Sequence, residues 1–355
     1  MAREPNTSEA RGIWDVTRSN QQRNAAYGER WPLTYVPIPA WSGDRYFSYS
    51  GYGSGGSGGY QIRYEYCNSV TLASAWTIPA TYTMNWYMRW NYTGKMSNGT
   101  RIVNAGGYAN WLSAINHIYY IQATAPFYYT YAFGSVVPYL LQGARGGSDG
   151  TTGIYGGGYN ATAGGATSLK NKITIATTGS ATTHGNLYGT RQYGGSASGA
   201  TYFCTFGGDA SSGAATNWDY ETFATGGTSA LAGNLEGGGS PRYNKDCDAI
   251  DGGVGSSRIV LAGGAWQHGG HGNAMFHYTT ASFGVGTDYG NMANAREANS
   301  TTGNGTYGVI AGGQGMAAYE SGSLIFNVGT LSLATVGGHA LNYGVTTNGM
   351  GAGNQ

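Results

Sequence analysis

A short motif, in which an apolar run ends in paired glycines, recurs along the chain and constrains its fold more than any other feature. Clear copies read "TRIVNAGGY" (100–108), "TTGIYGGGY" (151–159), "SSRIVLAGGA" (256–265) and "GTYGVIAGGQ" (305–314). Aligned on the glycine that closes each run, the steps are 56, 51, 50, 56 and 49 residues between Gly51, Gly107, Gly158, Gly208, Gly264 and Gly313. A period of this length indicates a repeat architecture, in which each unit buries its apolar face against its neighbours.

Each unit contains further strand and turn signals. A second short segment, rich in Tyr, Ile, Phe and Thr, follows every glycine pair, and this composition is typical of strands. These segments are 61–66, 117–124, 172–179, 218–226, 274–281 and 323–330. A third segment follows at 184–189, 232–237, 289–294 and 337–342. Clusters such as "SNGTR" (97–101) and "SDGTT" (148–152) precede the next run and supply the Gly and Asn of hairpin turns.

About four short strands in each repeat of about 50 residues match a kelch-type β-propeller blade. We therefore expect an all-β fold, a six-bladed kelch-like β-propeller over residues 43–355. Its blades would begin near residues 45, 101, 152, 202, 258 and 307. A parallel β-helix or a fibrous glycine-rich sheet is the alternative, but such repeats usually span only about 20–30 residues. The paired glycines are expected on a strand near the central channel, where side chains lack room.

The last unit predicts closure of the propeller. "LNYGVTTNGMG" (341–351) looks like the strand and turn that precede an apolar run, and no such run follows. We therefore expect residues 341–347 to pair with the first unit, which removes the free sheet edges that invite aggregation. The repeated arginines, Arg45, Arg101 and Arg258, precede matching strands and are expected to be structural.

Residues 1–42 lie outside the repeat and are expected to form an N-terminal arm. A short helix is predicted within "GIWDVTRSNQQRNAAYGERWP" (12–32), with Asp15 as its cap and Gly28 just after its end. The segment 32–41 is expected to be an extended connector held by its prolines. The arm either packs on its own propeller as a cap or docks on a neighbouring subunit, and both interpretations stay open.

The composition favours a turn-rich β protein and argues against several functional classes. Glycine supplies 64 of 355 residues, and 14% are aromatic, a share that disfavours disorder. The formal net charge is +1 and no basic stripe occurs, so no nucleic-acid partner is expected. The N-terminal residues lack the apolar core of a signal peptide, and no apolar stretch is long enough for a membrane helix. We therefore expect synthesis in a cytoplasm and no membrane insertion.

Motifs for catalysis or cofactor binding are missing from the sequence, so we expect no enzyme and no cofactor. GxSxG, HExxH and Walker motifs do not occur, and neither does a sialidase Asp-box. Two clusters offer metal ligands: His268, His271 and His277 in one, and Asp246, Asp248 and Asp251 in the other. Neither has zinc or EF-hand spacing, so no metal is predicted and the aspartates are expected in a solvated loop. Three scattered cysteines are expected to be buried free thiols: Cys67, Cys204 and Cys247.

Two stretches resemble proteins of tailed bacteriophages. The Trp…Trp-Pro leader within 12–32 resembles the start of many of their structural proteins. "GIYGGGYN" followed by "NKITIATTGSATTHGNL", within 151–195, resembles kelch-like repeats of phage virion proteins, particularly from aquatic phages. The units over 45–145 are tyrosine-rich and depart from this pattern. The resemblance implies a component of the virion, such as a tail fibre, a capsid-decoration protein or a tail-associated protein, and it implies no catalytic set.

Dense aromatic runs mark a candidate interaction surface at "NWYMRWNYTG" (85–94) and "PFYYTYAF" (126–133). Exposed Tyr and Trp suit protein contacts and stack on sugar rings, whereas buried ones would fill space between blades. The candidate contact residues, two of them from the arm, are Trp14, Trp31, Trp86, Tyr87, Trp90, Tyr92, Tyr128, Tyr129 and Tyr131. We therefore expect a non-enzymatic structural component that contacts other virion proteins and forms a homo-oligomer. The alternatives are a module for host attachment that binds a host glycan or receptor protein and, ranked last, a carbohydrate-active propeller enzyme.

Overall fold

The structure of this chain is a computed structural model. It describes residues 45–52, 60–68, 94–109, 113–114, 116–122, 130–135, 140–199, 201–210, 213–235, 248–251, 258–264, 272–297, 300–303, 307–311, 314–315, 322–327, 332–340 and 350–353. Contacts divide the chain into two units, Met1–Ala40 and Trp41–Gln355, and all described residues belong to the second. The N-terminal arm and its predicted helix lie outside the described residues.

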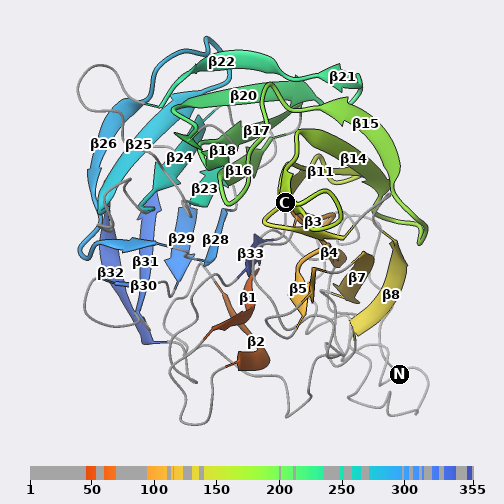
Figure 1. Cartoon of the computed structure of the whole chain (residues 1–355). Helices are drawn as coiled ribbons and strands as arrows, with labels where there is room; N and C mark the ends of the chain where they lie inside the picture. Colours follow the sequence, from red (N-terminus) through yellow and green to blue (C-terminus); the bar gives the residue numbers. More distant parts are fainter. Residues whose placement is uncertain are drawn as a thin grey trace, which may run out of the picture. The chain divides into compact units, whose positions relative to one another are not determined.

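Within the described residues the repeat units form six antiparallel sheets (Figure 1), which we number 1 to 6 in chain order. Sheet 1 is β2 (Tyr60–Asn68), β1 (Arg45–Tyr52) and β33 (Met350–Gly353). Sheet 2 is β3 (Gly94–Ser97), β4 (Arg101–Ala105), β7 (His117–Gln122) and β8 (Thr130–Ser135). Sheet 3 is β10 (Arg145–Ser148), β11 (Thr152–Gly156), β14 (Leu169–Thr174) and β15 (Thr182–Asn186), with β21 (Gly227–Thr228) added in parallel.

The remaining large sheets follow the same antiparallel order. Sheet 4 is β16 (Gly195–Ser198), β17 (Tyr202–Phe206), β20 (Asn217–Thr222) and β22 (Ala230–Asn234). Sheet 5 is β23 (Asp248–Asp251), β24 (Arg258–Ala262), β25 (Ala274–Thr279) and β26 (Thr287–Asn291). Sheet 6 is β28 (Ser300–Gly303), β29 (Tyr307–Ala311), β31 (Gly322–Asn327) and β32 (Ser332–Ala340).

Short two-residue strands form smaller sheets in the connections between these elements. They are β9 (Leu141–Gln142) with β12 (Tyr159–Asn160) and β13 (Gly165–Ala166), β18 (Asp209–Ala210) with β19 (Gly213–Ala214), β5 (Tyr108–Ala109) with β6 (Ser113–Ala114), and β27 (Arg296–Glu297) with β30 (Gln314–Gly315). No helix occurs among the described residues, so the all-β prediction is confirmed for them. The search of this same part of the chain finds no helix that could span a membrane.

The repeat predicted the positions of the strands well. The six apolar runs are β1, β4, β11, β17, β24 and β29, and each begins at the predicted start of its unit. The segments predicted to follow them overlap β2, β7, β14, β20, β25 and β31, and all but the first extend beyond the C-terminal end of the strand. Four of the apolar-run strands, β4, β11, β17 and β24, share one burial pattern: the first residue is half-buried and the other four are buried. Burial on both faces explains why these runs read as continuous apolar stretches rather than alternating ones.

The predicted turn clusters act through the side chains of Asn98 and Asp149. The Asn98 carboxamide oxygen accepts hydrogen bonds from the backbone N–H groups of Thr100 and Arg101, at 3.1 and 2.8 Å. One Asp149 carboxylate oxygen likewise accepts hydrogen bonds from two backbone N–H groups, those of the second and third residues after it. Such Asx turns hold the chain reversals between β3 and β4 and between β10 and β11.

In four units the paired glycines lie directly after the strand of the apolar run and not on it, so the prediction is wrong for Gly106–Gly107, Gly157–Gly158, Gly207–Gly208 and Gly263–Gly264. In the first unit Gly51 lies on β1, and the glycine pair of the last unit lies outside the described residues. Gly157 and Gly158 both have positive φ, at 66° and 94°. The Gly158 N–H donates a 2.7 Å hydrogen bond to the carbonyl of Arg191, and a Cβ on Gly157 would lie 2.6 Å from that same oxygen. Glycine is therefore required because the backbone turns left-handed while pressed against another backbone segment.

The apolar core is divided among the spaces between neighbouring sheets. One cluster joins sheets 2 and 3 through side chains such as Val103 and Ile173. A second joins sheets 3 and 4 through Ile154 and Phe203. Further clusters lie between sheets 4 and 5 and between sheets 5 and 6. Large aromatic side chains fill these spaces, as Trp218 does, so burial accounts for part of the aromatic surplus.

The first strands of successive sheets contact one another in a continuous series. In sequence order these contacts are β3 with β10, β10 with β16, β16 with β23, β23 with β28, and β28 with β33, which also contacts β3. Met350–Gly353 forms β33 and pairs antiparallel with β1 over Tyr46–Tyr49. The C-terminal segment therefore joins the first unit as expected, but through 350–353, whereas the predicted 341–347 lies outside the described residues.

Serine side chains at equivalent positions of three successive units connect the first strands of their sheets. The Ser148 hydroxyl donates to the Ser97 carbonyl at 2.7 Å and accepts the Ser97 N–H at 2.9 Å. The Ser148 N–H in turn donates to the Ser198 hydroxyl at 3.0 Å. These residues are 51 and 50 positions apart, one repeat each, and all are buried. Serines one repeat apart thus connect β3 to β10 and β10 to β16.

Candidate functional site

Tyr131 is the single candidate contact residue within the described part of the chain. The other eight, Trp14, Trp31, Trp86, Tyr87, Trp90, Tyr92, Tyr128 and Tyr129, lie outside it. Tyr131 is 38% exposed on β8, and its ring stacks on Tyr120 with centroids 5.1 Å apart. Tyr120 is buried and meets Phe133 edge to face. The run 126–133 therefore contains both a partly exposed ring, Tyr131, and a ring buried in the core, Phe133.

Arg101 has the structural role expected for the repeated arginines. Its guanidinium lies over the Tyr120 ring, 4.7 Å from the centroid. It also donates hydrogen bonds to the carbonyls of Ile175 and Ala176, at 3.1 and 2.6 Å. Because these carbonyls belong to the β14–β15 turn, Arg101 links sheet 2 to sheet 3.

The two candidate metal clusters fall largely outside the described residues. His268, His271 and Asp246 are among those not described, and His277 lies half-buried on β25. Burial, reinforced by the charge of Arg258, lowers the pKa of His277. The backbone from Asp248 to Asp251 forms β23, so the prediction of a solvated loop is wrong for these positions. A search of the described residues for metal-binding clusters of His, Cys, Asp and Glu finds none.

The prediction that the cysteines are buried free thiols is confirmed at Cys204. This thiol is free and buried on β17. Burial, together with the negative charges of Asp219 and Glu221, raises the pKa of Cys204 well above its ordinary value. The thiol therefore stays protonated and behaves as a small apolar side chain.

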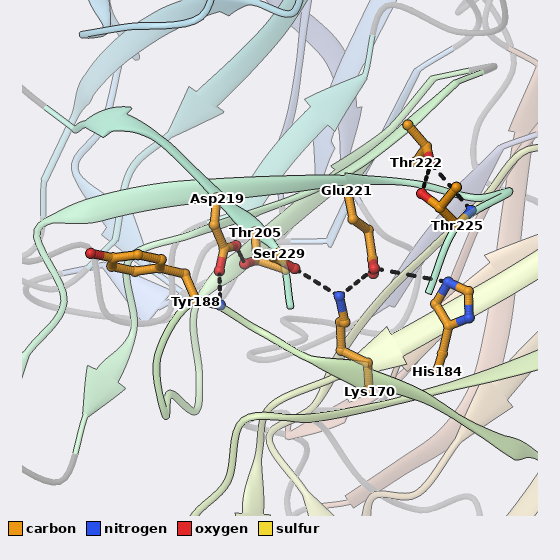
Figure 2. Close-up of polar contacts among 9 residues, drawn as sticks. All are labelled: Lys170, His184, Tyr188, Thr205, Asp219, Glu221, Thr222, Thr225 and Ser229. Carbon is orange, nitrogen blue, oxygen red and sulfur yellow. Dashed lines mark hydrogen bonds and ion pairs between the residues drawn. The ribbon is translucent and has the colours of Figure 1, made fainter. Parts of the chain in front are cut away.

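The most concentrated polar chemistry lies between sheets 3 and 4, in a group that we call the buried polar cluster: Lys170, His184, Asp219, Glu221 and Ser229 (Figure 2). Lys170 and His184 come from β14 and β15, whereas Asp219 and Glu221 come from β20. Ser229 connects β21 to β22. The members therefore face one another across the joint between two sheets.

Lys170 is the centre of the cluster and is fully buried, with no exposed surface. Its ammonium forms an ion pair with the Glu221 carboxylate and donates a 2.8 Å hydrogen bond to the Ser229 hydroxyl. The His184 Nε2 atom lies 3.8 Å from the same Glu221 oxygen. Burying a lysine is costly unless a counter-charge and hydrogen bonds replace its hydration, and Glu221 and Ser229 provide them here.

Asp219 anchors the other end of the joint. Its carboxylate accepts a hydrogen bond from the Thr205 hydroxyl on the adjacent strand and a 2.7 Å hydrogen bond from the Tyr188 backbone N–H. The Arg191 guanidinium lies 3.4 Å from Asp219 and donates a 3.0 Å hydrogen bond to the Asn217 side chain. Tyr188 and Arg191 follow β15 of sheet 3, so Asp219 ties that connection to sheet 4.

Burial dominates the electrostatics of the cluster. It raises the pKa of Glu221 to about 7, against the opposing effect of Lys170. It lowers the pKa of Lys170, although the hydrogen bond and charge of Glu221 oppose this change. It also lowers the pKa of His184, with help from the positive charges of Lys170 and Lys172. Low hydration penalises each charged form, so the group is sensitive to pH near neutrality.

The geometry suits a structural joint more than a reaction centre. The side chains of Lys170, His184 and Glu221 are 0, 2 and 6% exposed, so a substrate has no route to them. Their hydrogen bonds run from sheet to sheet and hold the two in one register. Sequence reasoning missed this cluster, although alternating carboxylates in "WDYETF" were a signal that two acids share one strand face.

Comparison with known proteins adds no assignment. No family model matches the chain, and no curated protein matches it.

Proposed function

We propose that this protein is a non-enzymatic structural component of a bacteriophage particle, built as a six-bladed kelch-like β-propeller. In this proposal sheets 1 to 6 are the blades, and residues 1–42 form an arm that docks on neighbouring subunits. The phage assignment rests on the sequence resemblance of the leader and of residues 151–195.

The observation that carries the proposal is the continuous series of contacts among the first strands. Six units each contribute a strand to this series, and β33 contacts β28, β3 and β1. In a propeller the innermost strands surround a central axis and the C-terminal strand completes the first blade. This topology would leave no long free sheet edge on the inner side.

The joints between units support a rigid, scaffold-type role. Sheet 2 is linked to sheet 3 by Arg101 and by the Ser97–Ser148 pair, and sheet 3 to sheet 4 by the buried polar cluster. Each joint uses buried hydrogen bonds, which fix geometry more strongly than apolar contact alone. A particle component must hold its shape without cellular repair, and joints of this kind serve that requirement.

The docking part of the proposal depends on residues 1–42 and can be tested through the mass of the protein in solution. Light scattering would compare the full chain with a Trp14→Ala/Trp31→Ala variant, and far-UV circular dichroism would confirm that both are folded. A truncation that removes residues 1–42 is a second variant. We expect the full chain to form a defined oligomer, and both variants to be compact monomers.

Two results would overturn parts of this proposal separately. If the full chain and both variants are all monomers, the arm is a cap on its own propeller and the docking role is wrong. If the purified chain hydrolyses a panel of oligosaccharides, and the activity follows the protein through purification, the non-enzymatic assignment is wrong.

A further inference from the structure

A hollow of about 390 Å³ opens at the edge of sheet 3. Its wall comes from β11, β14 and β15, and the β14–β15 turn over 177–180 closes one side. Phe133 of β8 and Phe223, which follows β20, complete the lining. This volume falls within the range of about 300–1,000 Å³ that is usual for small-molecule sites.

The lining is rich in hydroxyl groups that the strand register places together. Six of the twelve described lining residues carry one: Thr152, Thr174, Thr177, Thr178, Ser180 and Thr182. Thr152 lies opposite Thr174, and Lys172 lies opposite Thr182. Lys172 and Thr174 are two residues apart on β14 and both are exposed, so they point from the same face of the strand.

Among the described residues of the lining, Lys172 is the only charged one and none is acidic. Its ammonium forms no hydrogen bond or ion pair within the part of the chain that the structure describes. The positive charge of Lys172 also helps to lower the pKa of His184, after burial and Lys170. The hollow thus presents an unneutralised positive charge beside hydroxyl groups.

The floor of the hollow is apolar. Phe223, only 6% exposed, forms this floor, because its core cluster lies on the face of sheet 3 from which Lys172 and Thr174 point. Phe133 and Ile173 belong to the core on the opposite face, between sheets 2 and 3. A ligand that fits this surface needs a negative group for Lys172, hydroxyl groups for the threonines and C–H groups for the floor. These features are combined in a sugar ring that carries a carboxylate.

We propose that this hollow binds a small hydroxylated carboxylate, namely a single acidic sugar residue. The Lys172 ammonium pairs with the carboxylate, and the hydroxyl groups of Thr152, Thr174 and Thr182 exchange hydrogen bonds with the sugar. The ring packs against Phe223. This site shares β14 and β15 with the buried polar cluster but uses none of its side chains, and it does not depend on the scaffold role or on oligomer formation.

The test is a ligand-observed NMR titration of the full chain with D-glucuronate, D-glucose, acetate and inorganic phosphate. We expect saturable binding of glucuronate, with glucose and acetate each at least about threefold weaker, because each lacks one half of the recognised chemistry. Phosphate that competes as well as glucuronate would reduce the hollow to a simple oxyanion site and overturn the sugar assignment. Glucuronate binding that does not saturate would overturn the site itself.

Matched variants test whether the ligand binds in this hollow. Lys172→Gln should weaken glucuronate binding by about threefold to fivefold, the range for an exposed ion pair, and Lys172→Arg should retain most of it. Thr182→Val should weaken binding, whereas Thr183→Val should not, since Thr183 is exposed on the opposite face of β15. Circular dichroism would confirm the fold of each variant. Equal affinities for Lys172→Gln, Thr182→Val and Thr183→Val would place the sugar elsewhere and overturn the proposal.

Discussion

A single added methyl group at Gly185 should destabilise the joint between sheets 3 and 4. Gly185 lies on β15 with φ at 119°, and it pairs in parallel with Gly227 of β21. A Cβ at Gly185 would overlap the carbonyl oxygen of Gly227, which belongs to the backbone and cannot rotate away. The same close approach recurs one unit earlier between Gly134 and Gly179. The glycine is therefore required by contact between units and not by the strand itself.

The size of the effect follows from three contributions to Gly185→Ala. An alanine held at positive φ costs about 1–2 kcal/mol. Forcing the two strands apart costs about another 1–3 kcal/mol. The smaller conformational freedom of the unfolded alanine chain offsets about 0.4–1 kcal/mol of this. We expect the free energy of unfolding to fall by about 3 kcal/mol, a large part of the total of about 5–15 kcal/mol typical of proteins.

This change in the free energy of unfolding would be measured by urea titration, with far-UV circular dichroism and tryptophan fluorescence as the two signals. Gly189→Ala is the matched control, because Gly189 is the second glycine of "HGNLYG", has no positive φ and has no neighbouring atom within 4 Å of an added Cβ. That control should be unchanged or more stable by up to about 1 kcal/mol. Both variants could instead unfold at the same midpoint urea concentration, with the same dependence of the unfolding free energy on urea. In that case the close approach of Gly185 to Gly227 does not limit stability, and the reasoning is refuted.

Three other substitutions test the remaining joints. Ser148→Ala leaves the buried Ser97 N–H without its acceptor and should cost about 1–3 kcal/mol of unfolding free energy, whereas Ser180→Ala, at an exposed turn, should cost almost nothing. Arg101→Met removes a cation–π contact and two hydrogen bonds and should cost about 1–3 kcal/mol, measured by the same urea titration. Because burial raises the pKa of Glu221 from 4.5 to about 7, the folded chain keeps a proton that the unfolded chain releases, so this group makes the free energy of unfolding fall as pH rises from about 4.5 to 7. Glu221→Gln should remove that slope from a series of urea titrations across this pH range, and an unchanged slope would contradict the assignment.

The repeat determined most of the local structure in advance. Strong side-chain patterns specify strands and turns through short-range physics, so the starts of β4, β11 and β24 could be read from the sequence. Asn98 and Asp149 likewise act on backbone N–H groups only a few residues away. The C-terminal segment was expected to pair with the first unit, and residues 350–353 do pair with β1, whereas the predicted 341–347 lies outside the described residues.

Contacts between units were harder to predict because they depend on faces that meet only after folding. The paired glycines were recognised, but their position after the strand follows from the carbonyl groups that approach them, such as that of Arg191. The carboxylates of Asp219 and Glu221 read as ordinary strand residues until sheet 3 is packed against them. The partners Lys170 and His184 come from strands of the preceding unit, and Tyr188 and Arg191 from the connection after β15, so no local pattern connects them to these carboxylates.

Lys170 and Lys172 distinguish what the sequence determines from what only the tertiary structure determines. The segment "LKNKIT" places both lysines on one face of a strand, and the period of two makes that placement independent of context. Packing alone decides that Lys170 is fully buried against Glu221 while Lys172 stays exposed beside a hollow lined with hydroxyl groups. Alternation is a property of the local backbone, whereas the depth of each position depends on the neighbouring sheet that covers it.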